Sequence, residues 1–356
     1  CLALNGLELD PARLILAARD AEWYAGSRCG VSDQAAMILG GTGEIVNVAL
    51  FAPQLDVNGA RRLAFPDDLA ILVVNSHTSR SISGAEMLEY ARNRFAYSLA
   101  LEALRHEMLA AGYAPDVVEG LDRLARFSPE VLPEWRDVAN VYALLARVPE
   151  EVSLEDLRQR YDLRDLDGAY RQYFGTLPDE ERPRRFRLRG PLIYGLAESE
   201  RARIFPDLIE RGDYAGAGRL MSIGHDGDRR IRPDGAPYRF AVDDNALRGY
   251  AREGTPLVEC PGVYGASSPV LDALVDAALR AGALGACLTG AGIAGTVLAL
   301  CRAADAPAVA EAIRRRMAAA DYAELARLDA PLSAEQLAGA VVINRAAASA
   351  LTTLPG

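Results

Sequence analysis

The stretch CGVSDQAAMILGG, residues 29–41, places a lone carboxylate, Asp33, between a tight turn and an apolar helix. An aspartate at such a position accepts hydrogen bonds from free backbone N–H groups and faces the positive end of the helix dipole. Helix capping alone therefore explains this residue. A role for Asp33 in proton transfer needs support from the rest of the chain.

A second candidate is the glycine-rich stretch TGAGIAG, residues 289–295. Its spacing is similar to that of a dinucleotide-binding loop. Such a loop opens a helix, whereas this one joins two strand-like segments, so the dinucleotide-binding interpretation lacks its structural context. Glycines between two strands can let a nest of backbone N–H groups approach an anion. A plain tight hairpin explains the same residues, and both interpretations stay open from this loop alone.

Composition excludes several classes of chemistry. The 356 residues contain no Lys, so every cation is Arg, which rules out a Walker-type phosphate loop and a Schiff-base lysine. The net charge of −10 argues against a nucleic-acid or anionic-membrane partner, and no apolar run reaches the roughly 18 residues of a membrane span. The histidines and cysteines lack metal-binding spacing, and the cysteines indicate reduced thiols of a cytoplasmic protein: Cys1, Cys29, Cys260, Cys287 and Cys301.

The elements that must position these residues can be predicted from pattern. We expect helices over residues 11–25, after Ser32 up to Gly40, through much of 84–157, over 190–205 and from Pro269 to Gly282. We expect strands at 44–51 and 69–76 and a strand, glycine loop and strand over 283–301. Residues 158–185 indicate a polar helical excursion on the surface, and the basic run at 182–189 a solvated face. Helices mixed with such strands favour an α+β fold.

Several motifs in one order resemble the galactokinase branch of the GHMP small-molecule kinases. AGSRCGVSDQAAMILGG is similar to the segment that carries that family's catalytic aspartate, and YGASSPVLDALVDAALRAGALGACLTGAGIAG to its third signature. VVNSHTSRSISGAEMLEYARNRFAY, GLAESERAR and RLMSIGHDGD match further blocks between them. The resemblance covers nearly the whole chain, and several ordered motifs are far more specific than one.

The resemblance implies phosphoryl transfer from ATP to a sugar hydroxyl, with Mg²⁺ as cofactor. Asp33 matches the catalytic aspartate, whose place at a helix start favours an ionised, fixed carboxylate. Cys29 and Gly30 fall in the same substrate-binding segment, and Tyr90 matches a sugar-contacting tyrosine. A tyrosine that only packs its helix is an equally ordinary explanation for Tyr90.

The nucleotide side of the expected site comes from elsewhere in the chain. The resemblance assigns the glycine loop, Thr289, Gly290, Ala291 and Gly292, to ATP. Glu22, eleven residues before Asp33, lies close to where the family has a magnesium ligand, and oxygen ligands suit Mg²⁺. A solvated helix carboxylate is the alternative for Glu22.

Two further helical positions accompany these assignments. Arg92 and Arg94 lie on the same predicted helix as Tyr90. His225 falls in a histidine-containing block that the family has near its domain interface, and a structural role is the alternative for this histidine.

The chain also departs from the family pattern. Ala294 replaces a glycine of the third signature, and Cys287 stands where galactokinases usually carry a basic residue. These changes leave the sugar open among galactose, L-arabinose and related pyranoses. The first family signature and the Gly/Ser-rich phosphate loop have no match, so we expect the chain to be a piece of a longer protein.

The resemblance implies a two-domain GHMP kinase fold. Residues 1–85 would be the remainder of a truncated N-terminal domain of the ribosomal S5 domain 2-like type. Residues 86–356 would form a helical segment and a ferredoxin-like C-terminal domain with extra helices. A missing N-terminal segment or a second copy of the chain is an expected partner. The alternative to an enzyme is a non-catalytic sugar-binding or regulatory protein on the same scaffold, or an inactive fragment.

Overall fold

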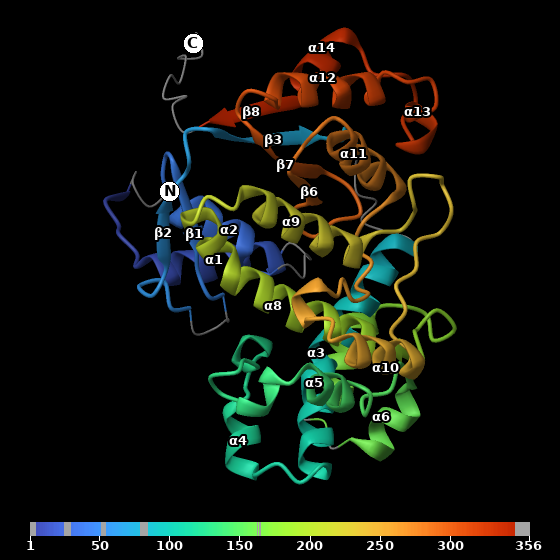
Figure 1. Cartoon of the computed structure of the whole chain (residues 1–356). Helices are drawn as coiled ribbons and strands as arrows, with labels where there is room; N and C mark the ends of the chain where they lie inside the picture. The colour runs from blue at the N-terminus through green and yellow to red at the C-terminus, as the bar shows by residue number, and fades with distance from the viewer. Residues whose placement is uncertain are drawn as a thin grey trace.

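The computed structural model describes residues 5–24, 30–50, 55–78, 85–161, 163 and 165–345. A sheet with its covering helices lies at the top of Figure 1 and a helical part at the bottom. Helices α8 (Arg189–Glu210) and α9 (Tyr214–Asp228) lie between these two parts, and the N-terminal elements lie beside them. The architecture therefore combines helices and antiparallel strands, as the sequence pattern predicts.

The main sheet has four antiparallel strands in the order β6-β7-β3-β8. The helix directly before β6 and the helix directly after β7 pack on this sheet and give it the β-α-β-β-α-β pattern of a ferredoxin-like domain. These elements are β3 (Leu69–Asn75), α11 (Pro269–Arg280), β6 (Gly285–Leu288), β7 (Thr296–Arg302), α12 (Ala306–Met317) and β8 (Val341–Arg345).

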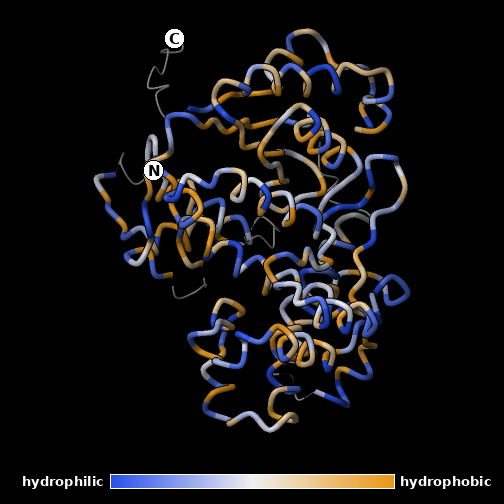
Figure 2. The backbone as a smooth tube through the Cα atoms, viewed as in Figure 1, coloured by the Kyte–Doolittle hydropathy of each residue, from blue (hydrophilic) through white to orange (hydrophobic). Residues whose placement is uncertain are grey.

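Strand β3 lies at the centre of this sheet and is buried on both faces. Ala70, Leu72 and Val74 pack with residues of α11 and α12, whereas Leu69 packs with residues of α8 and α9. This double burial explains the unbroken apolar run that predicts the strand, which is strongly hydrophobic in Figure 2. The predicted division at residue 85 assigns β3 to the N-terminal domain, whereas β3 pairs here with strands of the C-terminal half.

Helix α9 packs directly on edge strand β6 because two glycines face each other there. A Cβ on Gly285 would lie 1.9 Å from the carbonyl oxygen of Gly218, and a Cβ on Gly218 would lie 2.3 Å from the Leu284 carbonyl. Only a residue without a side chain fits at either position. This close contact determines where the later part of α9 lies relative to the loop after β6.

The helical part has its own core around α3 (Ala85–Ala110) and α7 (Leu166–Phe174). Phe95 is fully buried, and its ring lies 5.3 Å from that of Phe174 and 4.8 Å from that of Phe186. The sequence predicts that residues 158–185 form a polar excursion on the surface. This prediction is wrong for the apolar face of the stretch, which packs into the core. Leu166, Tyr170 and Phe174 recur every four residues, which places them along one side of α7.

The other elements are short and mostly connect or cover these parts. None of the helices in the described ranges has the length and apolar character needed to cross a membrane. The remaining elements are α4 (Pro115–Gly120), η2 (Leu124–Arg126), η3 (Pro133–Arg136), α5 (Val138–Leu145), β4 (Glu151–Ser153), α6 (Leu154–Arg160), β5 (Arg185–Arg187), α10 (Asp244–Glu253), η4 (Leu257–Glu259), α13 (Tyr322–Leu325) and α14 (Ala334–Gly339).

The N-terminal elements form a small unit of two helices and a two-stranded sheet. Helices α1 (Pro11–Tyr24) and α2 (Ser32–Leu39) begin and end close to the predicted residues. Strand β1 (Glu44–Asn47) is shorter than predicted, and its partner β2 (Arg61–Ala64) lacks a recognisable strand pattern in the sequence. Ile15, Val31, Ala35 and Leu39 form the buried centre of this unit.

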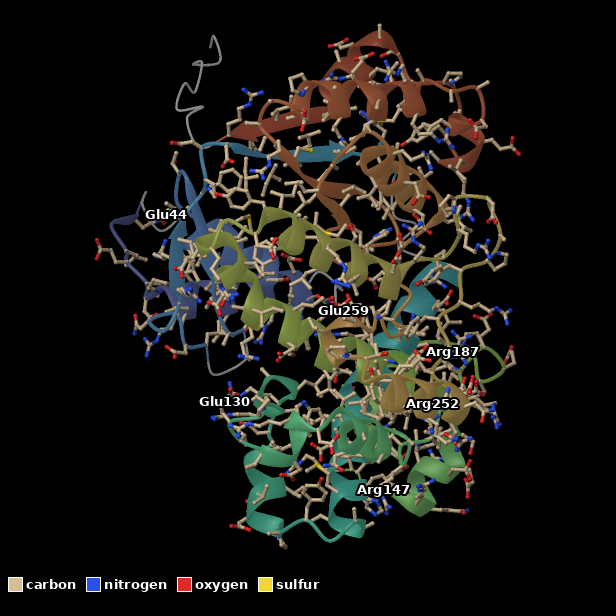
Figure 3. The ribbon with its side chains drawn as sticks, viewed as in Figure 1. Glu44, Glu130, Arg147, Arg187, Arg252 and Glu259 are labelled. Atoms are coloured by element: carbon tan, nitrogen blue, oxygen red, sulfur yellow. The ribbon has the colours of Figure 1, made fainter. Side chains whose placement is uncertain are left out.

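The basic run at 182–189 has two environments. Arg184, Arg185 and Arg187 are exposed, as predicted, and Arg187, the last residue of β5, is labelled in Figure 3. Arg189 is instead buried at the start of α8. Its guanidinium donates to the carbonyls of Ala146, Val148 and Val242 at 2.8–2.9 Å and pairs with Asp244 at 2.8 Å.

We expect Arg189→Ala to lower the free energy of unfolding by about 3 kcal/mol, because three carbonyl groups lose their donor in a buried setting. The matched control is Arg187→Ala, which removes the same side chain at an exposed position and should change the free energy by less than about 0.5 kcal/mol. Urea unfolding measures both. Equal effects of the two substitutions would contradict the buried role of Arg189.

Candidate active site

A pocket of about 170 Å³ lies where several distant segments of the chain meet. The start of α2 contributes one side, the loop after β6 another, and residues of α3, α8, α9 and the segment before α11 the rest. The structure thus brings together four of the predicted site residues. The lining residues are Gly30, Ser32, Asp33, Arg94, Tyr194, Asp228, Tyr264, Ala266, Leu288, Gly290 and Ala291.

Asp33 lies in the first turn of α2 with its side chain exposed. The N-cap position belongs to Val31, and no side chain caps the helix there. Capping of this position therefore does not explain Asp33. Its carboxylate lines the pocket near the positive end of the α2 dipole, which stabilises a negative charge.

Glu22 lies on α1, beside α2 but outside the lining of the pocket. Its Oε1 accepts a hydrogen bond of 2.5 Å from Nε2 of Gln34, the residue after Asp33. This bond holds the carboxylate against α2. The described residues contain no group of three or more acidic, histidine or cysteine side chains arranged to hold a metal ion.

The glycine loop joins β6 to β7, as predicted, so no helix follows it in the way a dinucleotide-binding fold requires. Gly290, Gly292 and Gly295 have positive φ, and so does Ile293 at 67°. The N–H of Ile293 donates to the Ala266 carbonyl at 2.6 Å, and a Cβ on Gly292 would lie 2.1 Å from that same oxygen. The loop therefore takes a compact left-handed path that requires glycine.

Two stacked tyrosines form a further wall of the pocket. The rings of Tyr194 and Tyr264 lie 5.1 Å apart with an interplanar angle of 15°. The Tyr194 hydroxyl donates to Asp228 Oδ2 at 2.9 Å, and the Tyr264 carbonyl accepts from Nδ2 of Asn93 at 2.7 Å. Burial raises the pKa of Tyr194 well above its ordinary value, so the hydroxyl remains a hydrogen-bond donor.

Asp228 is a functional candidate that sequence reasoning missed. It ends α9, is 3% exposed, and its Oδ1 accepts from the Ala266 N–H at 3.1 Å. Burial raises the pKa of Asp228 to about 6, although the hydrogen bonds from Ala266 and Tyr194 oppose that rise. The sequence signal that could have indicated Asp228 is its position three residues after His225 in GHDGD, which places both side chains on one face of a helix.

A second pocket of about 340 Å³ adjoins the first and shares Tyr194, Asp228, Leu288 and Gly290 with it. Thr289 and Cys287 line this second pocket. Burial raises the pKa of the Cys287 thiol to about 12, so the sulfur is a neutral group. Cys260, Cys287 and Cys301 are not in disulfide bonds.

The remaining predicted residues divide between described and undescribed positions. Cys29 lies outside the described residues, and so does the side chain of Tyr90, whose backbone belongs to α3. Arg92 donates from Nε to the Arg185 carbonyl at 3.0 Å, toward the helical part, whereas Arg94 lines the pocket. Gly292 is buried under Ala266 and does not line either pocket.

Comparisons with known proteins show which proteins this chain is similar to. Residues 204–319 match the family described as GHMP kinases C terminal. Galactokinase from Streptomyces coelicolor is 31% identical over 156 residues, which are 44% of this chain and 30% of that protein. The crystal structure of Lactococcus lactis galactokinase complexed with galactose matches 96% of this chain and 61% of that chain, with a TM-score of 0.50 and 17% identity.

The chain thus spans less than two thirds of the length of either relative. The matches confirm the α+β fold class and the resemblance of the chain to GHMP kinases.

The raised pKa of Asp228 predicts a pH-dependent effect of Asp228→Asn. The folded chain binds this proton more tightly than the unfolded chain, so the contribution of Asp228 to stability is greatest below about pH 4 and declines up to about pH 6. The loss amounts to about 3 kcal/mol. The stability of the Asn variant relative to wild type should therefore rise between pH 4 and 6 and then level off.

Urea unfolding at several pH values measures this difference. Asp234→Asn, which changes an exposed turn carboxylate, is the control and should show no such rise. A difference between Asp228→Asn and wild type that does not change with pH would contradict a buried, proton-retaining carboxylate.

Proposed function

We propose, from the match of residues 204–319 to the C-terminal domain of GHMP kinases, that the chain acts as a galactokinase-like sugar kinase. The reaction is transfer of the γ-phosphoryl group of ATP to a hydroxyl of a sugar, with the anomeric hydroxyl as the expected acceptor. The observation that best supports this function is the pocket itself. It joins Asp33 to Gly290 and Ala291 of the glycine loop, and these residues lie at opposite ends of the sequence.

In this proposal Asp33 accepts the proton of the sugar hydroxyl. As the hydroxyl oxygen forms its bond to phosphorus, the O–H bond breaks and ADP leaves with the electrons of the former P–O bond. Such a carboxylate needs correct placement more than high basicity, because a hydroxyl attacking a phosphoryl group loses its proton late. The first turn of α2 gives Asp33 a defined position at the wall of the pocket.

The glycine loop and Arg94 are suited to the phosphate side of the reaction. Positive φ at Gly290 and Gly292 arranges the loop so that backbone N–H groups can approach an anion. Arg94 lines the same pocket and supplies a guanidinium, which binds phosphate oxygens through paired donors. The chain has no Lys that could replace it.

Glu22 is the residue that would hold Mg²⁺. Magnesium is usually bound by one or two carboxylates together with phosphate oxygens and water, so one protein carboxylate fits its needs. The hydrogen bond from Gln34 orients Glu22 beside the start of α2. When bound, the ion would neutralise charge on the phosphate oxygens of the nucleotide.

Galactose, L-arabinose or a related pyranose is the proposed acceptor, since the galactokinase-like blocks run through the sequence in order. Ala294 and Cys287 depart from the family pattern, and Cys287 places a neutral thiol beside the glycine loop where a cation is usual. These departures from the family pattern favour an alternative function for the chain. A sugar-binding or regulatory protein would retain the tyrosine wall and would not turn over ATP.

Asp33→Asn, in the chain or in a longer product of its gene, should lower the turnover number at least about 100-fold, because the amide cannot accept the hydroxyl proton. The measurement is ADP release with galactose and L-arabinose as acceptors. Asp20→Asn, an exposed carboxylate on α1 that pairs with Arg19, is the control and should keep wild-type turnover. Turnover of the Asp33→Asn variant near the wild-type value would remove Asp33 from the mechanism.

The 356-residue chain by itself should bind magnesium-ATP only weakly, with a dissociation constant of about 1 mM or higher. Its sequence has no Gly/Ser-rich phosphate loop, and one glycine loop provides too few N–H donors for a triphosphate. Calorimetric titration with magnesium-ATP, and separately with galactose, measures this. Micromolar binding of ATP would show that the nucleotide site lies elsewhere in these residues, and tight sugar binding without turnover would favour the regulatory alternative.

A further inference from the structure

Strand β6 is the edge of the main sheet, and α9 supplies partners for its outward N–H groups. The N–H of Ala286 donates to Ser222 Oγ at 3.4 Å, and that of Leu288 donates to His225 Nδ1 at 3.3 Å. Residues two apart on a strand point the same way, and residues three apart on a helix share a face. The spacing of Ser222 and His225 therefore matches the spacing of the strand's free donors.

The bond to Leu288 fixes the state of the His225 ring. Because Nδ1 accepts a hydrogen bond, the ring proton is on Nε2, which lies 3.1 Å from Asp272 Oδ1. Both side chains are completely buried. Asp272 also accepts from Ser267 Oγ at 2.6 Å and from the Ile231 N–H at 2.9 Å, so the carboxylate is itself fixed in place beside the ring.

The other end of the glycine loop is held from the same helix. Asp228, one turn after His225, accepts from the Ala266 N–H at 3.1 Å through Oδ1. Ala266 in turn accepts from the Ile293 N–H at 2.6 Å. Residues 288 and 293 bracket the loop, so α9 controls its entry and its exit.

We propose that His225 is a positioning residue for the glycine loop: it holds Leu288 through Nδ1, the negative charge of Asp272 near Nε2 favours the proton on that nitrogen, and Asp228 holds the far end of the loop through Ala266. His225 does not touch the reacting atoms. It acts by keeping the N–H groups of the loop aimed at the pocket. The consequence for catalysis rests on the proposed kinase function, whereas the positioning itself does not.

Two conservative substitutions separate the two bonds of His225. In His225→Asn the side-chain oxygen lies near the position of Nδ1 and can still accept from Leu288. In His225→Gln the amide reaches toward Asp272 and leaves Leu288 without its partner. Ser222→Ala removes only the neighbouring bond to Ala286 and is the control for loss of an edge contact.

Hydrogen exchange of backbone amides over residues 286–295 is the test. His225→Gln should raise exchange at Leu288 and along the loop at least about tenfold, the effect of losing one hydrogen bond. His225→Asn should stay within about threefold of wild type, and Ser222→Ala should change exchange at Ala286 but not in the loop. Equal exchange rates in His225→Asn and His225→Gln, or an unchanged exchange rate of the loop in His225→Gln, would overturn the proposal.

A measurement on the unmodified chain keeps the test independent of how the variants fold. The ¹⁵N shifts of the His225 imidazole should show a protonated Nε2 and an accepting Nδ1. A proton on Nδ1 would overturn the proposal, because that nitrogen could not accept from Leu288. If the exchange results agree and no form of the protein turns over ATP, the positioning role stands and the kinase function fails.

Discussion

The direct packing of α9 on β6 is the contact on which the arrangement of the pocket depends. It is possible because Gly218 and Gly285 leave no side chains between the helix and the edge strand. With the helix this close, Ser222 and His225 reach the outward N–H groups of β6, which would otherwise be unpaired donors at a sheet edge. Asp228 then falls at the junction of the two pockets.

The ferredoxin-like sheet gives this contact a rigid base. Strand β3 pairs with both β7 and β8 and is buried on both faces, so β7, the strand that follows the glycine loop, is part of a well-packed layer. The start of α2 reaches the loop from a different unit of the chain. Asp33 is therefore carried by the small N-terminal unit, and Gly290 by the sheet.

Much of this arrangement could be predicted from the sequence, where local signals are strong. Asp10-Pro11 and Ser268-Pro269 mark helix starts, and the apolar run at 69–76 marks a buried strand. The ordered motifs led to Asp33, Gly30 and the glycine loop, which the structure places in or beside one pocket. Strand β2 was missed because its residues, RRLA, pair with β1 without an alternating pattern of their own.

Residues whose roles depend on tertiary contacts could not be found in the same way. Arg189 was predicted to be solvated because its neighbours are arginines, yet it is buried against three carbonyls that come from other segments. Tyr194 and Asp228 meet only when α8 and α9 pack, and no local spacing indicates their hydrogen bond. His225 was noted from its motif, but its partners Leu288 and Asp272 are visible only in the fold.

The central claim is that Asp33 and the glycine loop face one ligand-binding pocket. The most direct measurement is an NMR titration of the ¹⁵N-labelled chain with millimolar galactose and the magnesium complex of a non-hydrolysable ATP analogue. The account predicts that the amide signals of Gly30, Asp33, Gly290 and Ala291 shift together and saturate at the same ligand concentrations. Shifts confined to one of these segments, with the other unchanged at saturation, would contradict it.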